Sequence, residues 1–244
     1  MPKKSRIHIG TSGWSYDHWV GPFYPDGLSG DEFLGHYAKT FRTVEINNSF
    51  YHMPEKKTLR RWARTVPEDF TFSLKASRYI THMKKLKDSR KPVSRLLKTA
   101  EALGGKLGPV LFQLPPKWRV NRERLESFLE SLPGGHRYAF ELRDPSWFDD
   151  GVYSILEKHG AAFCIFEIGG LRSPEVVTSG MVYVRLHGPG AAYKGQYSED
   201  ALAGWAQRIK KWRRRKKEVF FYFDNDESGY APEDAKILSG MRKS

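Results

Sequence analysis

Eight short apolar runs, separated by stretches with helical periodicity, constrain the fold of this chain more than any other feature. Most are four to seven residues long and rich in aromatic and β-branched side chains, which is typical of strands. They read IHIGTS from Ile7, TVEIN from Thr43, FTFSLK from Phe70, VLFQLP from Val110, YAFELR from Tyr138, AAFCIFE from Ala161, VYVRLH from Val182 and VFFYFDN from Val219. Strand and helix alternating about eight times over 244 residues predict an α/β fold, a (β/α)8 barrel of the TIM type.

The chain has the length of one such barrel and is short for two independent domains. We therefore expect a single domain over residues 1–244, with its core at about 6–240. Between the sixth and seventh runs, the segment GGLRSPEVVTSG is too short and too broken for a full helix. One barrel helix is therefore expected to be irregular or missing at that place.

Side chains alternate between the two faces of a strand, so the inward face can be read from each run. In FTFSLK, for example, the large apolar residues share one face and Thr71, Ser73 and Lys75 share the other. The same parity gives an inward set near the strand ends: Ser12, Glu45, Asn47, Lys75, Gln113, Glu141, Arg143, Arg185, His187 and Asp224. Barrel enzymes build their sites at the C-terminal ends of the strands, so this set predicts a polar pocket there. The alternative is that some of these groups are buried ion pairs that hold the barrel shut.

Charge and composition indicate a soluble protein with an anionic partner. The net charge is +13 and the sequence pI is about 9.7, which favours an anionic substrate such as a nucleic acid or a phosphorylated small molecule. No apolar stretch approaches the length that spans a bilayer, and the basic N-terminus lacks the apolar region of a signal peptide. The single Cys164 cannot form an internal disulfide and is expected to pack in the core. We expect a cytoplasmic protein with no membrane association and no evident obligate protein partner.

The loops that follow the runs are rich in aromatic and glycine residues. Trp14, Tyr16, Tyr51, Trp147 and Tyr230 could stack on bases or sugars, or could form a hydrophobic lid packed on itself. HGPGAAYKGQYS and DNDESGYAPEDA follow the last two runs, at the place where barrels frequently hold a phosphate. Neither segment matches a P-loop or a dinucleotide-binding glycine motif, so a nucleotide cofactor has no direct support.

Several segments resemble the successive hallmarks of one family. IGTSGWSY, TVEINNSFY, FSLKASRYITH, LGPVLFQLPP, AFELRDPSWF, YVRLHGP and YFDNDESGYAP look like those of the YecE-like family, domain of unknown function 72, from about residue 6 to 240. The resemblance implies a TIM barrel but no activity. Its motif positions are Trp14, Glu45, Asn47, Lys75, His82, Gln113, Glu141, Arg143, Arg185, His187, Asp224 and Asn225. Glu167 departs from the pattern, because many relatives are expected to carry Asp there.

The first chemical hypothesis is metal-assisted hydrolysis. The architecture resembles that of endonuclease IV, and Glu45, Glu141, His187 and Asp224 have the side-chain types that could bind one divalent ion, Mn, Zn or Mg. Such an ion could activate water against a nucleic-acid phosphodiester, while nearby cations neutralise the developing charge. Against it, the chain has few histidines at strand ends.

The second hypothesis needs no metal. Glu45 or Glu141 would be a general base and Lys75 or His187 an acid, in a sugar-phosphate isomerase or lyase. A third possibility is a protein that binds a nucleotide or carbohydrate without catalysis. Across these alternatives the expected catalytic residues are Glu45, Lys75, Glu141, His187 and Asp224. The expected substrate-binding residues are Trp14, Tyr16, Asn47, Tyr51, His82, Gln113, Arg143, Trp147, Arg185, Asn225 and Tyr230.

Overall fold

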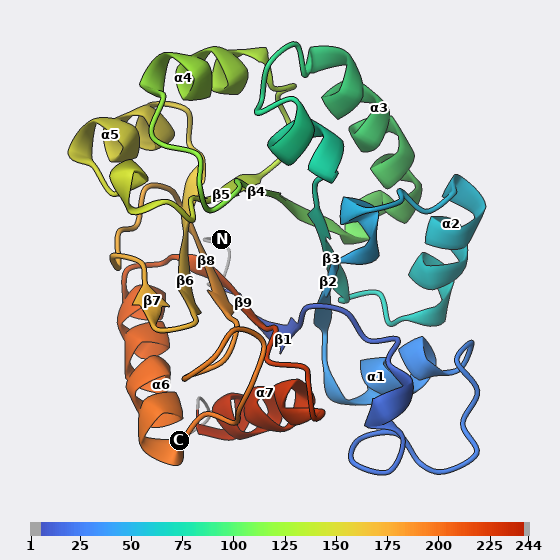
Figure 1. The fold of residues 1–244 in the computed structure, drawn as a ribbon. Helices are drawn as coiled ribbons and strands as arrows, with labels where there is room; N and C mark the ends of the chain where they lie inside the picture. Colours follow the sequence, from blue (N-terminus) through green and yellow to red (C-terminus); the bar gives the residue numbers. More distant parts are fainter. Residues whose placement is uncertain (1–5, 242–244) are drawn as a thin grey trace.

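Eight parallel strands form a ring that is enclosed by helices, which confirms the predicted barrel (Figure 1). The computed structural model describes residues 6–241. The barrel strands are β1 (Ile7–Thr11), β2 (Thr43–Ile46), β3 (Thr71–Lys75), β4 (Leu107–Gln113), β5 (Tyr138–Glu141), β6 (Ala162–Ile168), β8 (Met181–Leu186) and β9 (Glu218–Phe223). They are hydrogen-bonded in the order β1-β9-β8-β6-β5-β4-β3-β2.

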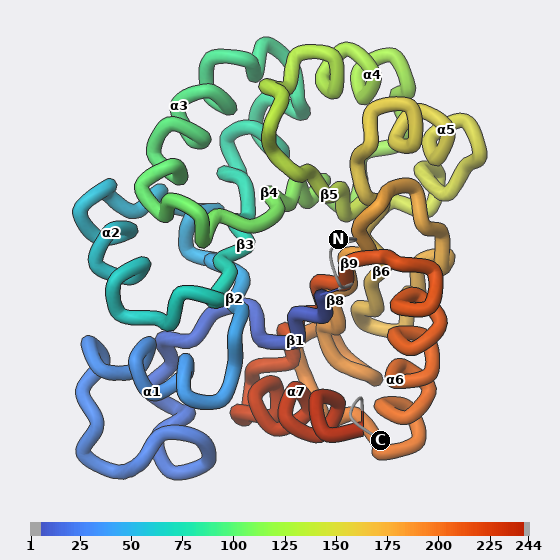
Figure 2. The backbone as a smooth tube through the Cα atoms, turned by 180° about the vertical axis from the view of Figure 1, so that it is seen from behind, coloured from blue at the N-terminus to red at the C-terminus, as the bar shows by residue number. Residues whose placement is uncertain are grey.

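The ring closes between β1 and β2, one residue beyond the end of β1. Ser12 forms a parallel bridge with Glu45, and the Gly13 amide donates a hydrogen bond to the Glu45 carbonyl oxygen at 2.9 Å. The backbone tube in Figure 2 follows this closure from the opposite side. Closure matters for the site because it brings the ends of β1 and β2 next to each other.

The outer ring contains seven α-helices in the described part of the chain. They are α1 (Phe33–Thr40), α2 (Lys56–Thr65), α3 (Arg90–Ala100), α4 (Arg122–Ser131), α5 (Asp150–Lys158), α6 (Glu199–Arg214) and α7 (Tyr230–Met241). Side-chain caps begin three of them, because the side chains of Asn121, Asp149 and Ser198 accept hydrogen bonds from the first turns of α4, α5 and α6. Shorter helical turns are η1 (Asp17–Trp19), η2 (Asn48–Phe50), η3 (Tyr79–Met83), η4 (Glu101–Lys106) and η5 (Pro145–Trp147).

The expected irregularity lies between β6 and β8. Instead of a helix, the chain makes a short strand, β7 (Leu171–Arg172), that pairs antiparallel with the end of β6. The glycines at 169 and 170 both have positive φ, which the tight reversal between the two strands requires. The prediction of a missing helix at this place is confirmed.

Strand parity separates two apolar clusters, as the alternation in the sequence predicts. The outward residues of the strands pack with the helices into one large core. A smaller cluster inside the barrel contains Leu111, Ala139, Ala162, Cys164, Met181, Tyr183, Phe220 and Tyr222. Cys164 packs there, and burial raises the pKa of its thiol. The inward positions nearer the C-terminal ends of the strands are polar.

Residues 6–241 form one barrel, whereas residues 1–5 and 242–244 of the expected single domain lie outside the described residues. Within the described range, no helix combines the length and the apolar character that crossing a membrane requires.

Candidate functional site

A fully buried arginine lies at the centre of the inward polar residues. Arg185 in β8 donates hydrogen bonds to Glu141 Oε2 at 2.7 Å, to Asp224 Oδ2 at 2.9 Å and to Glu45 Oε1 at 3.0 Å. The three acids come from the ends of β5, β9 and β2. One guanidinium therefore connects four strands across the barrel, and buried charge is tolerated because it is paired on every side.

A second layer of contacts surrounds these ion pairs. The hydroxyls of Ser12 and Tyr183 donate to the two oxygens of Glu45, at 2.5 and 2.6 Å. Arg143 Nε donates to Glu141 Oε1 at 2.5 Å, and His187 Nδ1 lies 2.9 Å from Asp224 Oδ2. We call the group formed by Glu45, Glu141, Arg143, Arg185, His187 and Asp224 the Arg185 cluster.

The cations of the Arg185 cluster hold two of its acids, Glu141 and Asp224, in their charged form. Burial by itself would raise the pKa of Glu141, but Arg143 and Arg185 outweigh it and hold that pKa well below its ordinary value. Burial likewise opposes ionisation of Asp224, whose pKa is nevertheless lowered, chiefly by Arg185. Acids that stay ionised and paired are poor proton acceptors near neutral pH.

Above the Arg185 cluster lies an open cavity of about 530 Å³, here called the mouth pocket. The loops after β1, β2, β3, β8 and β9 contribute its walls, which include Tyr16, Asn47, Lys75, Tyr193, Asp224 and Asp226. Asp224 therefore belongs both to the cluster and to the pocket wall. These loops follow the C-terminal ends of the strands, where the sequence predicts the pocket.

Lys75, the last residue of β3, differs from every cation of the Arg185 cluster. Its side chain is 6% exposed, and its ammonium nitrogen lies 4.4 Å from the centre of the Phe50 ring. Among residues 6–241, no carboxylate lies within ion-pair distance of this nitrogen. Burial, reinforced by the charge of Arg185, lowers the pKa of Lys75 to about 8.

Asp226 is a second group of the mouth pocket with a perturbed pKa. Its Oδ1 accepts a hydrogen bond from the Trp19 indole at 2.6 Å and lies 3.4 Å from His18 Nε2. Burial nevertheless raises the pKa of Asp226 to about 6. The mouth pocket thus holds an acid and a base whose pKa values both approach neutrality, a pattern typical of functional sites.

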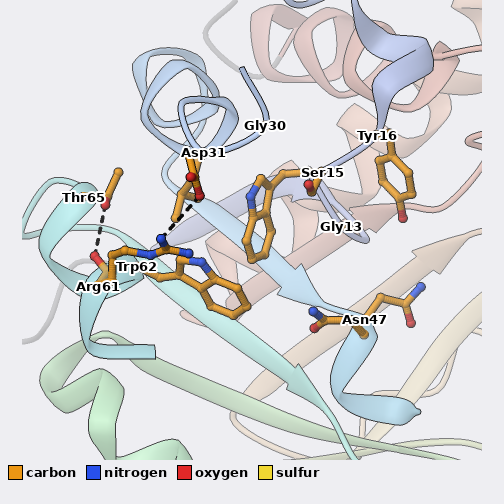
Figure 3. Close-up of a pocket in the computed structure, with 12 residues that line it drawn as sticks. Gly13, Ser15, Tyr16, Gly30, Asp31, Asn47, Arg61, Trp62 and Thr65 are labelled. Carbon is orange, nitrogen blue, oxygen red and sulfur yellow. Dashed lines mark hydrogen bonds and ion pairs between the residues drawn. The ribbon is translucent and has the colours of Figure 1, made fainter. Parts of the chain in front are cut away.

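A second cavity of about 400 Å³ adjoins the mouth pocket and shares Tyr16 and Asn47 with it. Figure 3 shows its walls, in which Trp62 and Arg61 of α2 lie opposite Asp31. The Trp14 and Trp62 rings meet edge to face at 4.8 Å, and Arg61 pairs with Asp31 at 3.3 Å. Trp14 is thus placed in this side cavity, beside the mouth pocket.

The structure places some expected substrate-binding residues away from both cavities. Trp147 is fully buried in η5, where its indole donates to the Trp118 carbonyl oxygen at 2.6 Å and packs on the Trp118 ring. Asn225 is also fully buried, and its amide donates to the Gly195 carbonyl oxygen and to Asp234. These two residues hold loops in place and line neither the mouth pocket nor the second cavity, so their positions do not support the expectation that they contact substrate.

Arg185 is not exposed either, and its guanidinium pairs with three carboxylates, so its position does not support direct contact with substrate. Glu45 and Glu141 are equally enclosed, so the expectation that either acts as a general base on a substrate is not supported by their positions. His187 is fully buried too, beneath the ring of Tyr193, whose centre lies 5.4 Å from its own.

The remaining expected residues have mixed placements. Tyr51 lines the mouth pocket with 73% of its surface exposed, and Tyr16 donates a hydrogen bond to the Ser12 carbonyl oxygen.

Gln113 ends β4 with a buried side chain, and His82 in η3 contacts Thr81 and Phe50. Tyr230 begins α7 and lines neither cavity. Glu167, the departure from the family pattern, pairs with Arg172 of β7.

The four expected metal ligands do not fit a shared ion. Glu45, Glu141 and Asp224 each point at the Arg185 guanidinium, at 2.7 to 2.9 Å, so a cation already occupies the space between them. Within the described range, the acid and histidine groups that could converge on one ion are Glu126, Glu130 and His159, on the outer helices. The geometry therefore does not favour the metal-assisted hypothesis.

Sequence reasoning did not single out several residues of the two cavities, among them Asp226, Trp62 and Tyr193. Asp226 lies beyond the last run in a loop, where strand parity no longer applies. Trp62 sits in a basic helix without a distinguishing signal, and Tyr193 lies in a loop and not on a strand, so parity does not place it either. Tyr193 receives a hydrogen bond from Arg143 at 3.3 Å and lines the mouth pocket.

Comparison with known proteins places this barrel among its relatives. The chain matches the family model described as "Protein of unknown function DUF72" over residues 8–243. It is 26% identical over 265 residues to the UPF0759 protein YunF of Bacillus subtilis (strain 168), covering 95% of this chain and 93% of YunF. It is 32% identical over 146 residues to the UPF0759 protein YecE of Escherichia coli (strain K12), covering 59% of this chain and 51% of YecE.

Solved structures agree with these matches. A crystal structure of a DUF72 family protein from Thermotoga maritima MSB8 is similar with a TM-score of 0.90 at 29% identity, over 98% of this chain and 100% of that one. A DUF72 family protein from Enterococcus faecalis V583 shares the fold with a TM-score of 0.80 at 21% identity, over 98% of each chain. The family model spans nearly the whole sequence and the fold agrees, so the chain belongs to the DUF72 family.

Proposed function

We propose that this protein is an enzyme that moves protons on a small anionic carbonyl compound, such as a sugar phosphate, in the mouth pocket. The reaction class is isomerase or lyase chemistry without a metal. The observation that carries the proposal is Lys75, a buried and unpaired lysine in the wall of an open cavity.

Two groups of the pocket have the proton affinities that such chemistry needs. General acid–base catalysis works best when the pKa of the group lies near the working pH. Lys75 with a pKa of about 8 and Asp226 with a pKa of about 6 meet this condition, and both line the mouth pocket. Glu141 and Asp224 do not, because arginine holds their pKa values low.

The distribution of charge supports an anionic substrate. Residues 56–98, which include α2, β3 and α3, contain fourteen Lys and Arg against three Asp and Glu, and so account for most of the net charge of +13. Twelve of the fourteen cations are exposed. The loop that follows Lys75 carries several of them on the same side of the barrel as the mouth pocket, where they would attract an anion.

Two alternatives are less well supported. Metal-assisted cleavage of nucleic acid would need ligands that converge on an ion, and the candidate acids converge on Arg185 instead. Binding without catalysis would account for the buried lysine, but it has no use for an acid and a base whose pKa values both approach neutrality in one pocket.

The test is incorporation of solvent deuterium. Sugar phosphates and oxo acids are incubated with the protein in deuterium oxide, and exchange next to the carbonyl group is followed by proton NMR. We expect exchange with wild type and its loss in Lys75→Met. Lys158→Met is the matched control, because Lys158 is an exposed lysine on α5 that pairs with Glu126 far from the pocket.

The control variant should exchange at the wild-type rate. Equal exchange in wild type and Lys75→Met would overturn the proposal. Binding of a phosphate compound by wild type without any exchange would also overturn it and would leave a binding protein.

A further inference from the structure

The position of Lys75 suggests a more specific role than proton transfer. Its ammonium nitrogen lies over the Phe50 ring, and the residue lines the mouth pocket. The other strongly buried lysine of the described residues, Lys106, has a different environment: its ammonium donates to the carbonyl oxygens of Ala63 and Val66 at 2.7 and 2.9 Å and lies 3.5 Å from Glu68. Lys106 is thus engaged by two carbonyl oxygens and a carboxylate, whereas Lys75 has no carboxylate within ion-pair distance among the described residues and faces a cavity.

We propose that Lys75 is a nucleophile that forms an iminium with an aldehyde or ketone carried by an anionic substrate, which makes the protein a Schiff-base lyase. This inference rests on the proposed function and narrows it to one class of intermediate and substrate. Three features of the site support it: a lysine amine in the wall of an open cavity, an acid in the same cavity that can donate a proton, and carboxylates that offset part of the cost of a cationic intermediate.

The amine is accessible in its reactive form. An ammonium group has no lone pair, so only the neutral amine can attack a carbonyl carbon. A lysine with the ordinary pKa of 10.5 has very little of that form at neutral pH. With the pKa lowered to about 8, about a tenth of Lys75 is neutral at pH 7.

The proton transfers of this step can be supplied by groups of the same pocket. The neutral Lys75 nitrogen attacks the carbonyl carbon, and one of its two protons passes to the carbonyl oxygen to give a neutral carbinolamine. A second proton, donated by Asp226, lets that oxygen leave as water, and the nitrogen lone pair forms the C=N bond of the iminium. Asp226, with a pKa of about 6, can give up this proton and recover it when water later hydrolyses the iminium.

Nearby carboxylates offset part of the cost of the charged intermediate. Asp224 forms part of the pocket wall, and Asp224, Glu45 and Glu141 are the acids whose charges act on Lys75. Burial and Arg185 act in the opposite direction and lower the pKa of Lys75, which leaves part of its amine neutral and able to react. The iminium can then accept the electron pair of an adjacent C–C or C–H bond as that bond breaks, which is the step that lyases of this kind need.

The experiment is reductive trapping. Dihydroxyacetone phosphate and pyruvate are used as probes, each with sodium cyanoborohydride, and modified lysines are located by peptide mass spectrometry. We expect Lys75 to be labelled by at least one probe tenfold or more faster than any exposed lysine, because at pH 7 a pKa of about 8 gives roughly 300 times more neutral amine than a pKa of 10.5. The labelling rate should rise with pH and level off above about 8.

Three variants sharpen the test. Lys75→Arg keeps the positive charge but should give no adduct at residue 75, and Asp226→Asn should slow labelling of Lys75. Lys158→Met should leave that labelling unchanged. Circular dichroism and thermal melting confirm that each variant is folded.

The outcomes separate this inference from the proposed function. Deuterium exchange without an adduct at Lys75 would overturn the iminium but leave proton transfer intact. An adduct at Lys75 without any exchange would support the nucleophile and overturn the isomerase alternative. Labelling confined to exposed lysines, with no exchange, would overturn both proposals.

Discussion

The Arg185 cluster and the mouth pocket lie one above the other at the same end of the barrel, and they treat charge in opposite ways. In the cluster, Arg185 has three carboxylate partners within 3.0 Å. In the pocket, Lys75 is nearly as buried but has no carboxylate partner among the described residues. Paired charges hold the strands together, while an unpaired one is retained at a cost to stability and is therefore the better candidate for function.

The largest expected effect comes from breaking the cluster. Arg185→Met leaves three buried carboxylates without their shared cation, so we expect the free energy of unfolding to fall by about 3–5 kcal/mol. Urea denaturation measures this free energy. The matched control is Arg208→Met, because Arg208 pairs with Glu175 at 2.6 Å on the surface and exposed pairs contribute about 1 kcal/mol or less. Similar losses in the two variants would contradict the contrast between buried and exposed pairs.

Replacing Lys75 in the mouth pocket is expected to change the free energy of unfolding in the opposite direction. Because the folded state lowers the pKa of Lys75 from 10.5 to about 8, the unfolded chain binds more protons between these values. The presence of Lys75 therefore destabilises the fold below about pH 8, and the penalty disappears as pH rises toward 10.5. Lys75→Met should stabilise the protein by about 1–3 kcal/mol at pH 7 and by much less at pH 10.

Denaturation at the two pH values checks this prediction. A variant that is less stable than wild type at pH 7 would indicate that Lys75 has a structural partner. In that case the contrast between pocket and cluster would fail.

The smallest expected effect is on acid stability. Glu141 and Asp224 have lowered folded-state pKa values, so the stability that they contribute is present above the unfolded-state pKa near 4 and is lost as pH falls through the folded-state values. In Glu141→Gln we expect the loss of stability between pH 5 and 3 to shrink by about 1–2 kcal/mol. Glu123→Gln, at the start of α4, is the control. If wild type and Glu141→Gln lose the same stability between pH 5 and 3, protonation of Glu141 does not destabilise the Arg185 cluster.

The alternation in the sequence was sufficient to predict the convergence of the site. Glu45, Glu141, Arg185 and Asp224 share the inward parity of their strands, and the barrel brings them to one centre because closure leaves inward side chains no other place. The missing helix before β8 was equally visible, since a short segment with Gly and Pro cannot form several turns.

The roles of those residues could not be predicted in the same way. Parity indicates that a side chain points inward but not how far it reaches, and the long side chain of Arg185 crosses the barrel to meet acids from three other strands. Trp147 and Asn225 follow strands as ligand-binding residues do, yet local packing directs them into the protein. Asp226 belongs to the mouth pocket only because its loop folds back over Trp19.

By itself, then, the sequence determined the barrel, the inward set and the end of the barrel at which that set gathers, because these depend on the period of side chains along each strand. Only the tertiary structure decided which charges are paired and which one is left without a carboxylate partner. Ion pairing depends on distances between strands far apart in the chain, and burial sets the pKa of Lys75 only after those strands have closed around it.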